Sequence, residues 1–519
     1  MANISASTAR FTYATGYGII STVMDIRTDH ELHHDIFGSI LDQTEMTPFL
    51  LQPATDYFTS LKQATQMMAN RGFDTLGSDT LRSSERERAS RYIRRAYDYC
   101  FKALFPFVNP QLDGLASLRS PNESLYRTCL AGIDAVSAIL DDPFFLALLD
   151  EDPRHLLLLA SSRKYSFVFT GYQGRDFAIP PYWQEAACCL LKTIHLIKSV
   201  EEDSQDINDV AQLGFFFEDR SIGLDDLYRF DWEHPAAVPD TEPAQRAFVK
   251  IATFFHRLNE SLGFDRNKGC LVFNSGDGVE VEIAEVKARL KSPESMVTKL
   301  GKSVEGEAFD IRDILAITFI QKDKHDTLKL FHALQKQGVI LQENTVSHSI
   351  TQTLFDDPAG MHEAVRRLVV SLAKGRGRDE LPDDGQVTAE ATSFFEALSK
   401  NADSNAHTGQ GHRKFQCKIG FSVPIHRAIA TNEILTPGTA RYAGRDSVSK
   451  KTEQHTLGVE LRISDVTSWR ESEQTGESHH DAYKFRQLLS VMNRLFKNMF
   501  HFPGSQAAQL RKDQAALFS

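Results

Sequence analysis

Cationic and hydroxyl side chains recur at short intervals over one segment of this 519-residue chain. They follow the pattern Arg-x-Lys-x-x-x-Ser-x-x-x-Lys, which here consists of Arg289, Lys291, Ser295 and Lys299, with Lys302 three residues later. Guanidinium and ammonium groups form charge-assisted hydrogen bonds with phosphate oxygens. The spacing therefore indicates a polyphosphate site, although a solvated basic helix face is the alternative interpretation of the same charges.

A helix over residues 292–302 is expected to position most of this pattern. Ser292 is a suitable N-cap, and Pro293 suits the first turn because its missing N–H costs little there. The first two members of the pattern are expected at the end of the preceding strand, beside the free N–H groups of the helix N-terminus, which attract anions. The other members then share one helix face at four- and three-residue spacing: Ser295, Lys299 and Lys302.

Two acidic residues follow in segments that have the character of strands. Asp313 directly precedes the apolar run Ile314 to Ile320, and Glu460 lies within the run Thr456 to Ile463. Mg²⁺ accepts carboxylate ligands and needs few of them when phosphates supply further oxygens. Asp310 is a competing ligand, but Asp313 enters the apolar strand directly. The structural alternatives are a strand-start hydrogen bond for Asp313 and a cross-strand charge pair for Glu460.

This succession resembles the catalytic domain of RelA/SpoT-type alarmone synthetases. In that family the basic pattern stands at the entrance to the ATP site. A strand that begins Asp-Ile/Leu-x-Gly/Ala-Ile-Arg supplies a magnesium-binding Asp, and a later Glu-x-Gln-Ile/Val strand supplies a Glu that serves the acceptor hydroxyl and the metal. The corresponding segments here are Asp313–Thr318 and Val459–Ile463, within a resemblance that covers roughly residues 245–500.

A second resemblance is to a poorly characterised bacterial branch of the same superfamily. It lies in the segments Ala187-Cys-Cys-Leu-Leu-Lys-Thr-Ile-His195 and Ser478-His-His-Asp-Ala-Tyr-Lys-Phe-Arg-Gln487, and it extends over about residues 180–495. This likeness implies that the helices of the N-terminal half belong with the catalytic domain.

The resemblance implies a Mg²⁺-dependent pyrophosphokinase. Such an enzyme transfers pyrophosphate from ATP to the 3′-hydroxyl of a purine nucleotide and gives a (p)ppGpp-like alarmone; an RNA 3′ end is an alternative acceptor. Asp313 and Glu460 would be the catalytic and metal-binding residues. The residues that would bind ATP are Arg289, Lys291, Ser295, Lys299 and Lys302. The candidate acceptor-binding residues are His412, Arg413, Arg462, His480 and Tyr483.

Three departures from the family pattern favour a different kind of protein. Thr318 stands where the strand has Arg, and Arg462 stands where the later strand has Gln, although Arg462 could supply a compensating charge. The Gly-Tyr motif whose ring stacks on the acceptor guanine is not evident near residues 405–420. The alternative is a catalytically degenerate synthetase-like protein that binds nucleotide, RNA or a protein partner.

Other clusters of acidic residues and histidines are weaker indications of a function. The segments 33–35 and 479–481 both read His-His-Asp, as in HD-type phosphohydrolases, but the first lies too near the N-terminus to have an upstream His partner. Glu280 and Glu282 could hold two metal ions in a polymerase-β-like nucleotidyltransferase together with the loop Asn274–Gly278. A half-exposed strand shows the same alternation for solubility alone.

Composition limits the class of protein. Hydrophobic residues make up 41% and charged residues 24%, which excludes a disordered or collagenous chain. The net charge of −11 argues against a surface built to coat nucleic acid, so any phosphate site must be a local basic patch. The six cysteines form no C-x-x-C pair and are expected to be reduced. Neither a signal peptide nor a membrane-spanning run is evident, so a cytoplasmic location without membrane contact is expected. The sequence indicates no oligomeric state.

The chain is long enough for several domains, and its hydrophobic patterns change along its length. An α+β architecture is expected, with a mixed sheet flanked by helices and preceded by a mainly helical region. The expected divisions are an irregular lead-in (1–55), a helical region (56–240), a nucleotidyltransferase domain (241–500) with a surface insertion near 373–412, and a tail (501–519).

Overall fold

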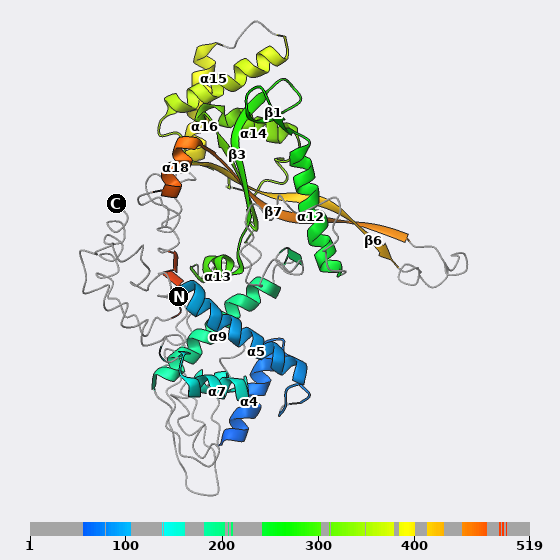
Figure 1. Ribbon diagram of the computed structural model, residues 1–519, viewed down its shortest axis with the longest axis vertical. Helices are drawn as coiled ribbons and strands as arrows, with labels where there is room; N and C mark the ends of the chain where they lie inside the picture. Colours follow the sequence, from blue (N-terminus) through cyan, green and yellow to red (C-terminus); the bar gives the residue numbers. More distant parts are fainter. Residues whose placement is uncertain are drawn as a thin grey trace, which may run out of the picture. The chain divides into compact units, whose positions relative to one another are not determined.

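The chain forms two compact units in the computed structural model, and each is considered by itself (Figure 1). The helical unit comprises residues 1–198, 297–306 and 485–517, and the sheet unit comprises 199–296, 307–484 and 518–519. The structure describes residues 56–77, 79–104, 138, 140–160, 181–202, 206, 209–210, 241–302, 311, 313–347, 349–377, 383–399, 413–429, 449–474, 487–488, 490–491 and 495.

The helical unit is built from amphipathic helices, as the sequence predicts. Its elements are α4 (Tyr57–Asn70), α5 (Ser83–Asp98), the π-helix η1 (Tyr99–Leu104), α7 (Pro143–Glu151), α8 (His155–Ala160) and most of α9 (Pro181–Glu202). Asp142 caps α7 by accepting from Phe144 N at 2.8 Å. Arg154 and Asp152 form a buried ion pair at 2.6 Å, and Arg154 also donates to Thr65 Oγ1. This pairing satisfies charges that burial would otherwise make costly.

A seven-stranded mixed sheet forms the centre of the other unit, which confirms the expected α+β class. Only the neighbouring strands β4 and β7 are parallel, and the other pairs are antiparallel. The strand order is β1-β2-β3-β4-β7-β6-β5. The strands are β1 (Leu262–Asp265), β2 (Cys270–Asn274), β3 (Glu280–Leu290), β4 (Leu315–Gln321), β5 (Thr351–Gln352), β6 (Phe415–Ile429) and β7 (Ser449–Asp465).

One face of this sheet is apolar and covered by helices. Alternate residues of the four central strands point to it, because side chains along a strand alternate between faces. Helix α12 (Glu242–Asn259) places Phe254 against Phe421, with ring centroids 5.1 Å apart. Helix α14 (Thr327–Lys336) places Phe331 against Phe415 at 5.2 Å. The hydrophobic core of the unit lies beneath these helices.

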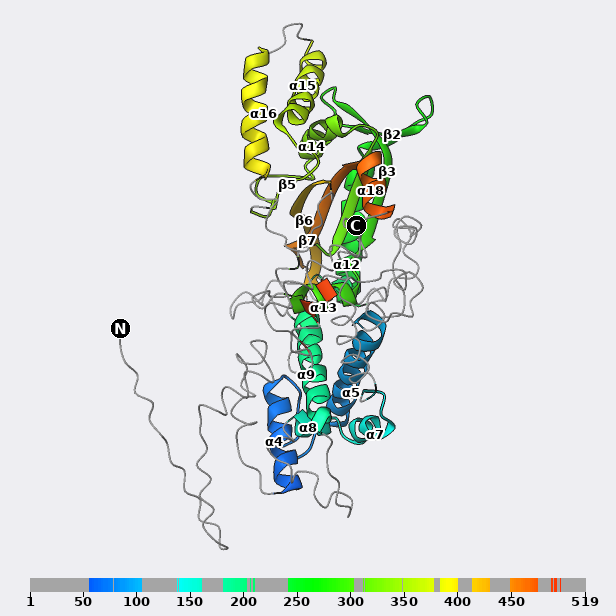
Figure 2. The same cartoon turned by 90° about the vertical axis from the view of Figure 1, so that its left-hand side faces the viewer.

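The segment expected to be a surface insertion contains more regular structure than the sequence indicates. A helix of one or two turns was expected near Phe394 to Leu398, whereas α16 runs from Asp384 to Ser399. It packs against α15 (Pro358–Gly375), which lies beside it in Figure 2. Val387 and Ala391 of this helix are buried, which gives α16 an apolar side.

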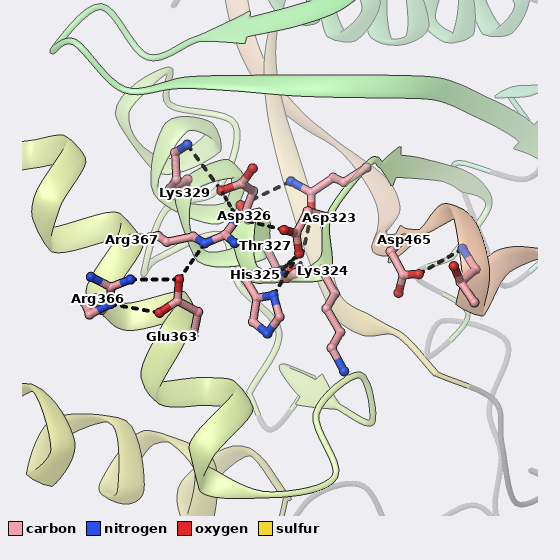
Figure 3. Close-up of polar contacts among 12 residues, drawn as sticks. Asp323, Lys324, His325, Asp326, Thr327, Lys329, Glu363, Arg366, Arg367 and Asp465 are labelled. Atoms are coloured by element: carbon pink, nitrogen blue, oxygen red, sulfur yellow. Dashed lines mark hydrogen bonds and ion pairs between the residues drawn. The ribbon is translucent and has the colours of Figure 1, made fainter.

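Charged side chains lie at the carboxyl ends of the two parallel strands, β4 and β7 (Figure 3). Beyond β4, Asp323 caps the short helix η5 (Lys324–Asp326) by accepting from His325 N at 3.0 Å. Asp465, the last residue of β7, caps α18 (Val466–Gln474) by accepting from Thr467 N at 2.9 Å. None of the helices in the described parts of the chain is both long enough and apolar enough to span a membrane.

Candidate functional site

The second face of the sheet carries polar and charged side chains, and we refer to it as the charged face. Strand register sets these residues in two rows that cross β3, β4, β7 and β6. The Glu460 row consists of Arg289, Ala316, Glu460 and Lys418. The Arg462 row consists of Lys287, Thr318, Arg462 and Gln416. Neighbouring strands lie about 4.8 Å apart, so each row brings side chains from distant segments together.

Glu460 lies near the middle of the charged face and is only 4% exposed. Arg462 Nη2 donates to Glu460 Oε2 over 2.6 Å. Burial raises the pKa of Glu460, and the nearby charge of Asp313 raises it further. The surrounding cations outweigh both effects and lower this pKa to about 2. These cations are Arg462, Lys414 and Lys291. Glu460 is therefore ionised at neutral pH.

The second predicted carboxylate, Asp313, lies just before β4 and is 6% exposed. Lys291 Nζ donates to Asp313 Oδ2, and Lys291 N donates to Ile314 O at 2.7 Å. The backbone contact holds the end of β3 beside the start of β4, so the pair is built into the sheet. Because the charge of Asp313 acts on Glu460, the structure brings the two expected catalytic residues into one electrostatic environment.

A partly buried lysine, Lys414, adds positive charge to this environment. Burial lowers the pKa of Lys414 to about 7, with further lowering from the positive charges of Arg462, Lys418 and Arg289. The charge of Glu460 opposes this effect. Several cations therefore lie near one another around Glu460. Their mutual repulsion would fall if an anion bound among them, so this arrangement favours anion binding.

The basic pattern begins as the sequence predicts. Arg289 is the next-to-last residue of strand β3, and helix α13 begins at Pro293 and ends at Lys302. Ser292 Oγ accepts from Ser295 N at 3.3 Å, which confirms Ser292 as the N-cap. Ser292 Oγ also donates to Ser295 Oγ at 3.1 Å. The N-terminal turn of α13 belongs to the sheet unit, whereas Lys299 and Lys302 lie on the part assigned to the helical unit.

Two of the five residues expected to bind the acceptor, Arg462 and Arg413, lie in the described part of the chain. Arg462 lies on the charged face, as described above. Arg413 forms an ion pair with Asp356 at 2.9 Å, and its backbone carbonyl accepts from Ser464 Oγ at 3.2 Å. The remaining three lie outside the described residues: His412, His480 and Tyr483.

Sequence reasoning missed the residues that β6 contributes. Gln416 and Lys418 lie on the charged face, and Lys414 immediately precedes the strand. They alternate with Phe415, Cys417 and Ile419, which are buried. This period-two alternation was a usable signal, because an apolar face implies an opposite face of shared chemistry. A further missed residue is Trp469 of α18, whose ring centroid lies 4.9 Å from Lys287 Nζ.

Asp313 and Glu460 could bind Mg²⁺ only if other ligands completed its coordination shell. Among the described residues, no group of three or more His, Cys, Asp or Glu side chains gathers to hold a metal ion. Mg²⁺ commonly takes one or two protein carboxylates and completes its shell with phosphate oxygens and water. Asp313 and Glu460 suit that mode, but each is now hydrogen-bonded to a cation. The competing ligand Asp310 lies outside the described residues.

The other acidic candidates have local partners. Glu282 pairs with Lys322 at 3.0 Å and with Lys268 at 3.4 Å, and Lys268 also lies 3.9 Å from Glu280. These contacts are what a solvated strand face requires. The segments 33–35 and 479–481 lie outside the described residues.

The charged residues at the strand ends in Figure 3 also pair with one another. Arg367 contacts Asp323 at 2.9 Å and Glu363 at 2.9 Å, and Lys329 contacts Asp326 at 3.3 Å. This network joins α15 to the start of α14 and has a structural role.

No protein-family model, no curated protein and no solved structure matches the chain.

Proposed function

We propose that the charged face binds a nucleotide polyphosphate and that the protein is a Mg²⁺-dependent pyrophosphokinase. Its donor would be ATP, and its acceptor the 3′-hydroxyl of a purine nucleotide. The observation that supports this most is the buried pair Asp313 and Glu460 within a larger group of cations. Two carboxylates could share a metal with phosphates, while the excess positive charge would neutralise those phosphates.

The choice of donor also rests on sequence. The first two residues of the basic pattern, Arg289 and Lys291, precede helix α13, whose capped N-terminus provides oriented N–H groups. Its order relative to Asp313 and Glu460 resembles that of RelA/SpoT-type synthetases. Arg289, Lys291 and Ser295 would hold the ATP phosphates at this end of the sheet. Lys299 and Lys302 remain candidates on the later turns of the helix.

Each carboxylate would have a distinct task in the transfer. The 3′-oxygen of the acceptor forms a bond to the β-phosphorus of ATP, and the bond from that phosphorus to the α,β-bridging oxygen breaks, which releases AMP. Glu460 would accept a hydrogen bond from the attacking hydroxyl and receive its proton as the new bond forms. Since the pKa of Glu460 is about 2, it would chiefly orient this hydroxyl and is a weak general base. Mg²⁺ held by Asp313 and Glu460 would supply charge neutralisation on the phosphates.

A second candidate is a nucleotide-, RNA- or protein-binding protein without transferase activity. The observation that favours it is the pairing of both carboxylates with cations, Lys291 with Asp313 and Arg462 with Glu460. Such pairs satisfy buried charges without any metal. In an active enzyme, phosphates would have to draw these cations away from the carboxylates.

Incubation with γ-labelled ATP, Mg²⁺ and each adenine or guanine nucleotide separates the two candidates. The pyrophosphokinase transfers label to the acceptor and forms AMP, and chelation of Mg²⁺ abolishes both. An RNA with a free 3′-hydroxyl is tested in parallel. Retained nucleotide binding without any labelled transfer product would refute the enzyme proposal and support the binding protein.

Two matched variants test the assignment of Glu460. Glu460→Gln removes the buried charge, and we expect it to abolish transfer while the variant still binds ATP. Glu453→Gln lies on the same strand, where Glu453 pairs with Lys451 and His455, and it should transfer label at the wild-type rate. Undiminished transfer by Glu460→Gln would contradict the role given to this residue.

A further inference from the structure

Two polar atoms on the charged face are buried without a hydrogen-bond partner among the described residues. They are Arg462 Nε, a donor, and Gln416 Oε1, an acceptor. Folded proteins pair the great majority of such atoms, so each exception calls for a physical explanation. One explanation is a ligand group that completes both hydrogen bonds.

Strand register places these two side chains next to each other. Gln416 of β6 lies directly opposite Arg462 of β7 in an antiparallel pair, where facing Cβ atoms are about 5 Å apart. A group that satisfies both atoms must accept one hydrogen bond and donate another. A single hydroxyl does so, because it has one donor hydrogen and two acceptor lone pairs.

The position of this hydroxyl relative to Glu460 indicates which part of a ligand carries it. The guanidinium of Arg462 uses Nη2 to hold Glu460 Oε2 at 2.6 Å, and its Nε lies on the same rigid group. A hydroxyl bound at Nε therefore lies close to any hydroxyl that Glu460 orients. In a ribose, the 2′- and 3′-hydroxyls stand on adjacent carbons. A purine base edge also offers adjacent donors and acceptors, but a base at this point would carry the sugar hydroxyls away from Glu460.

We infer that Arg462 Nε and Gln416 Oε1 bind the 2′-hydroxyl of the acceptor, so that the site selects ribonucleotides and rejects 2′-deoxyribonucleotides. The inference rests on the proposed function, because it places the 3′-hydroxyl at Glu460. A 2′-deoxy acceptor leaves both buried atoms unpaired. Sites built to hydrogen-bond a substrate hydroxyl discriminate strongly against the analogue that lacks it.

Binding measurements on the full-length protein test this inference without requiring catalysis. Calorimetric titrations with Mg²⁺ and a non-hydrolysable ATP analogue present compare GTP, 2′-deoxy-GTP and 3′-deoxy-GTP, and then the corresponding adenine nucleotides. We expect the wild-type protein to bind the ribonucleotide at least roughly tenfold more tightly than the 2′-deoxy form. The 3′-deoxy form keeps the 2′-hydroxyl but loses the hydrogen bond to Glu460, so its affinity measures the contribution of the 3′-hydroxyl alone.

Gln416→Met retains the length of the side chain and removes its acceptor. We expect it to reduce the ratio of ribonucleotide to 2′-deoxy affinity to nearly one. Gln454→Met, at an exposed position of β7, is the control and should keep the wild-type ratio. The comparison of nucleotides on the wild-type protein needs no variant, so the inference stays testable if Gln416→Met does not fold.

The outcomes separate this inference from the proposed function. Equal wild-type affinity for ribonucleotide and 2′-deoxyribonucleotide overturns the inference, and an unchanged ratio in folded Gln416→Met overturns the role of Gln416. Discrimination in binding without any labelled transfer upholds the hydroxyl site and contradicts the pyrophosphokinase. Transfer to ribo- and 2′-deoxy acceptors at equal rates upholds the pyrophosphokinase and contradicts the hydroxyl site.

Discussion

Arg462 lies directly opposite Thr318 in the register of the parallel strands β7 and β4. The RelA/SpoT-type pattern on which the proposed function rests has Arg at the position of Thr318 and Gln at that of Arg462. Adjacent strands are separated by about 4.8 Å, so a guanidinium remains on the same face, one strand away from its expected origin. The two departures from the family pattern therefore retain a positive charge beside Glu460.

Replacing Arg462 with Met should destabilise the protein. The change leaves Glu460 buried without its 2.6 Å partner, and loss of one member of such a pair costs about 3 kcal/mol. The pKa of Glu460 should rise above its present value of about 2. Urea unfolding at pH 7 measures the loss, with Arg470→Met at an exposed position of α18 as the control. Equal stability of the two variants would show that the pair contributes little.

Acid should weaken the fold partly through Glu460. Its folded pKa of about 2 lies below the ordinary value of 4.5, so its stabilising contribution is fully present above pH 4.5. That contribution is lost as the pH falls from 4.5 through 2. We expect the midpoint of urea unfolding to decline less steeply over this range in Glu460→Gln than in the wild type. Glu471→Gln, at an exposed position, should follow the wild-type curve.

Nucleotide binding should depend on pH through Lys414. Its pKa of about 7 means that the ammonium is formed below pH 7 and lost above it. A bound polyphosphate favours the charged form, so affinity should fall as the pH rises from 6 to 8.5, by at most about tenfold per unit above 7. Titrations of an ATP analogue at each pH measure this change. The ionisation of the nucleotide itself also changes over this range, so the Lys414→Met variant provides the baseline. Parallel curves for both proteins would contradict the prediction.

The buried ammonium group of Lys250, on helix α12, should contribute to the free energy of unfolding. Lys250 of α12 is 1% exposed and lies 2.5 Å from Asp206 Oδ1 and 3.1 Å from Asp209 Oδ2. Asp206 Oδ2 in turn accepts from Gly458 N at 3.2 Å, just before Val459 in β7. Lys250→Met should lower the free energy of unfolding by about 3 kcal/mol, because it leaves the fully buried carboxylate of Asp209 with Arg246 as its remaining ion-pair partner among the described residues and removes the ammonium partner of Asp206. Chemical denaturation measures the change against Lys336→Met, an exposed position on α14, which should be near neutral.

Local features of the site could be predicted from the sequence. Pro293 and Ser292 indicate the start of α13, since an N-cap and a first-turn proline depend on a few adjacent residues. The apolar run after Asp313 indicates the buried strand β4. The length of α16 was underestimated because its first two turns contain only one large apolar side chain, Val387, although both Val387 and Ala391 are buried.

By itself, the sequence determined the helix that carries the later part of the basic pattern, the strand that follows Asp313, the strand that carries Glu460, and the α+β class. Only the tertiary structure decided that β4 and β7 are parallel neighbours, so that Arg462 faces Thr318, and that β6 pairs with β7 in the register that sets Gln416 opposite Arg462. Strand pairing joins segments more than a hundred residues apart, and a register shift of one residue would turn every side chain to the other face. The partners of Glu460 and the two unpaired atoms beside it are therefore properties of the assembled sheet.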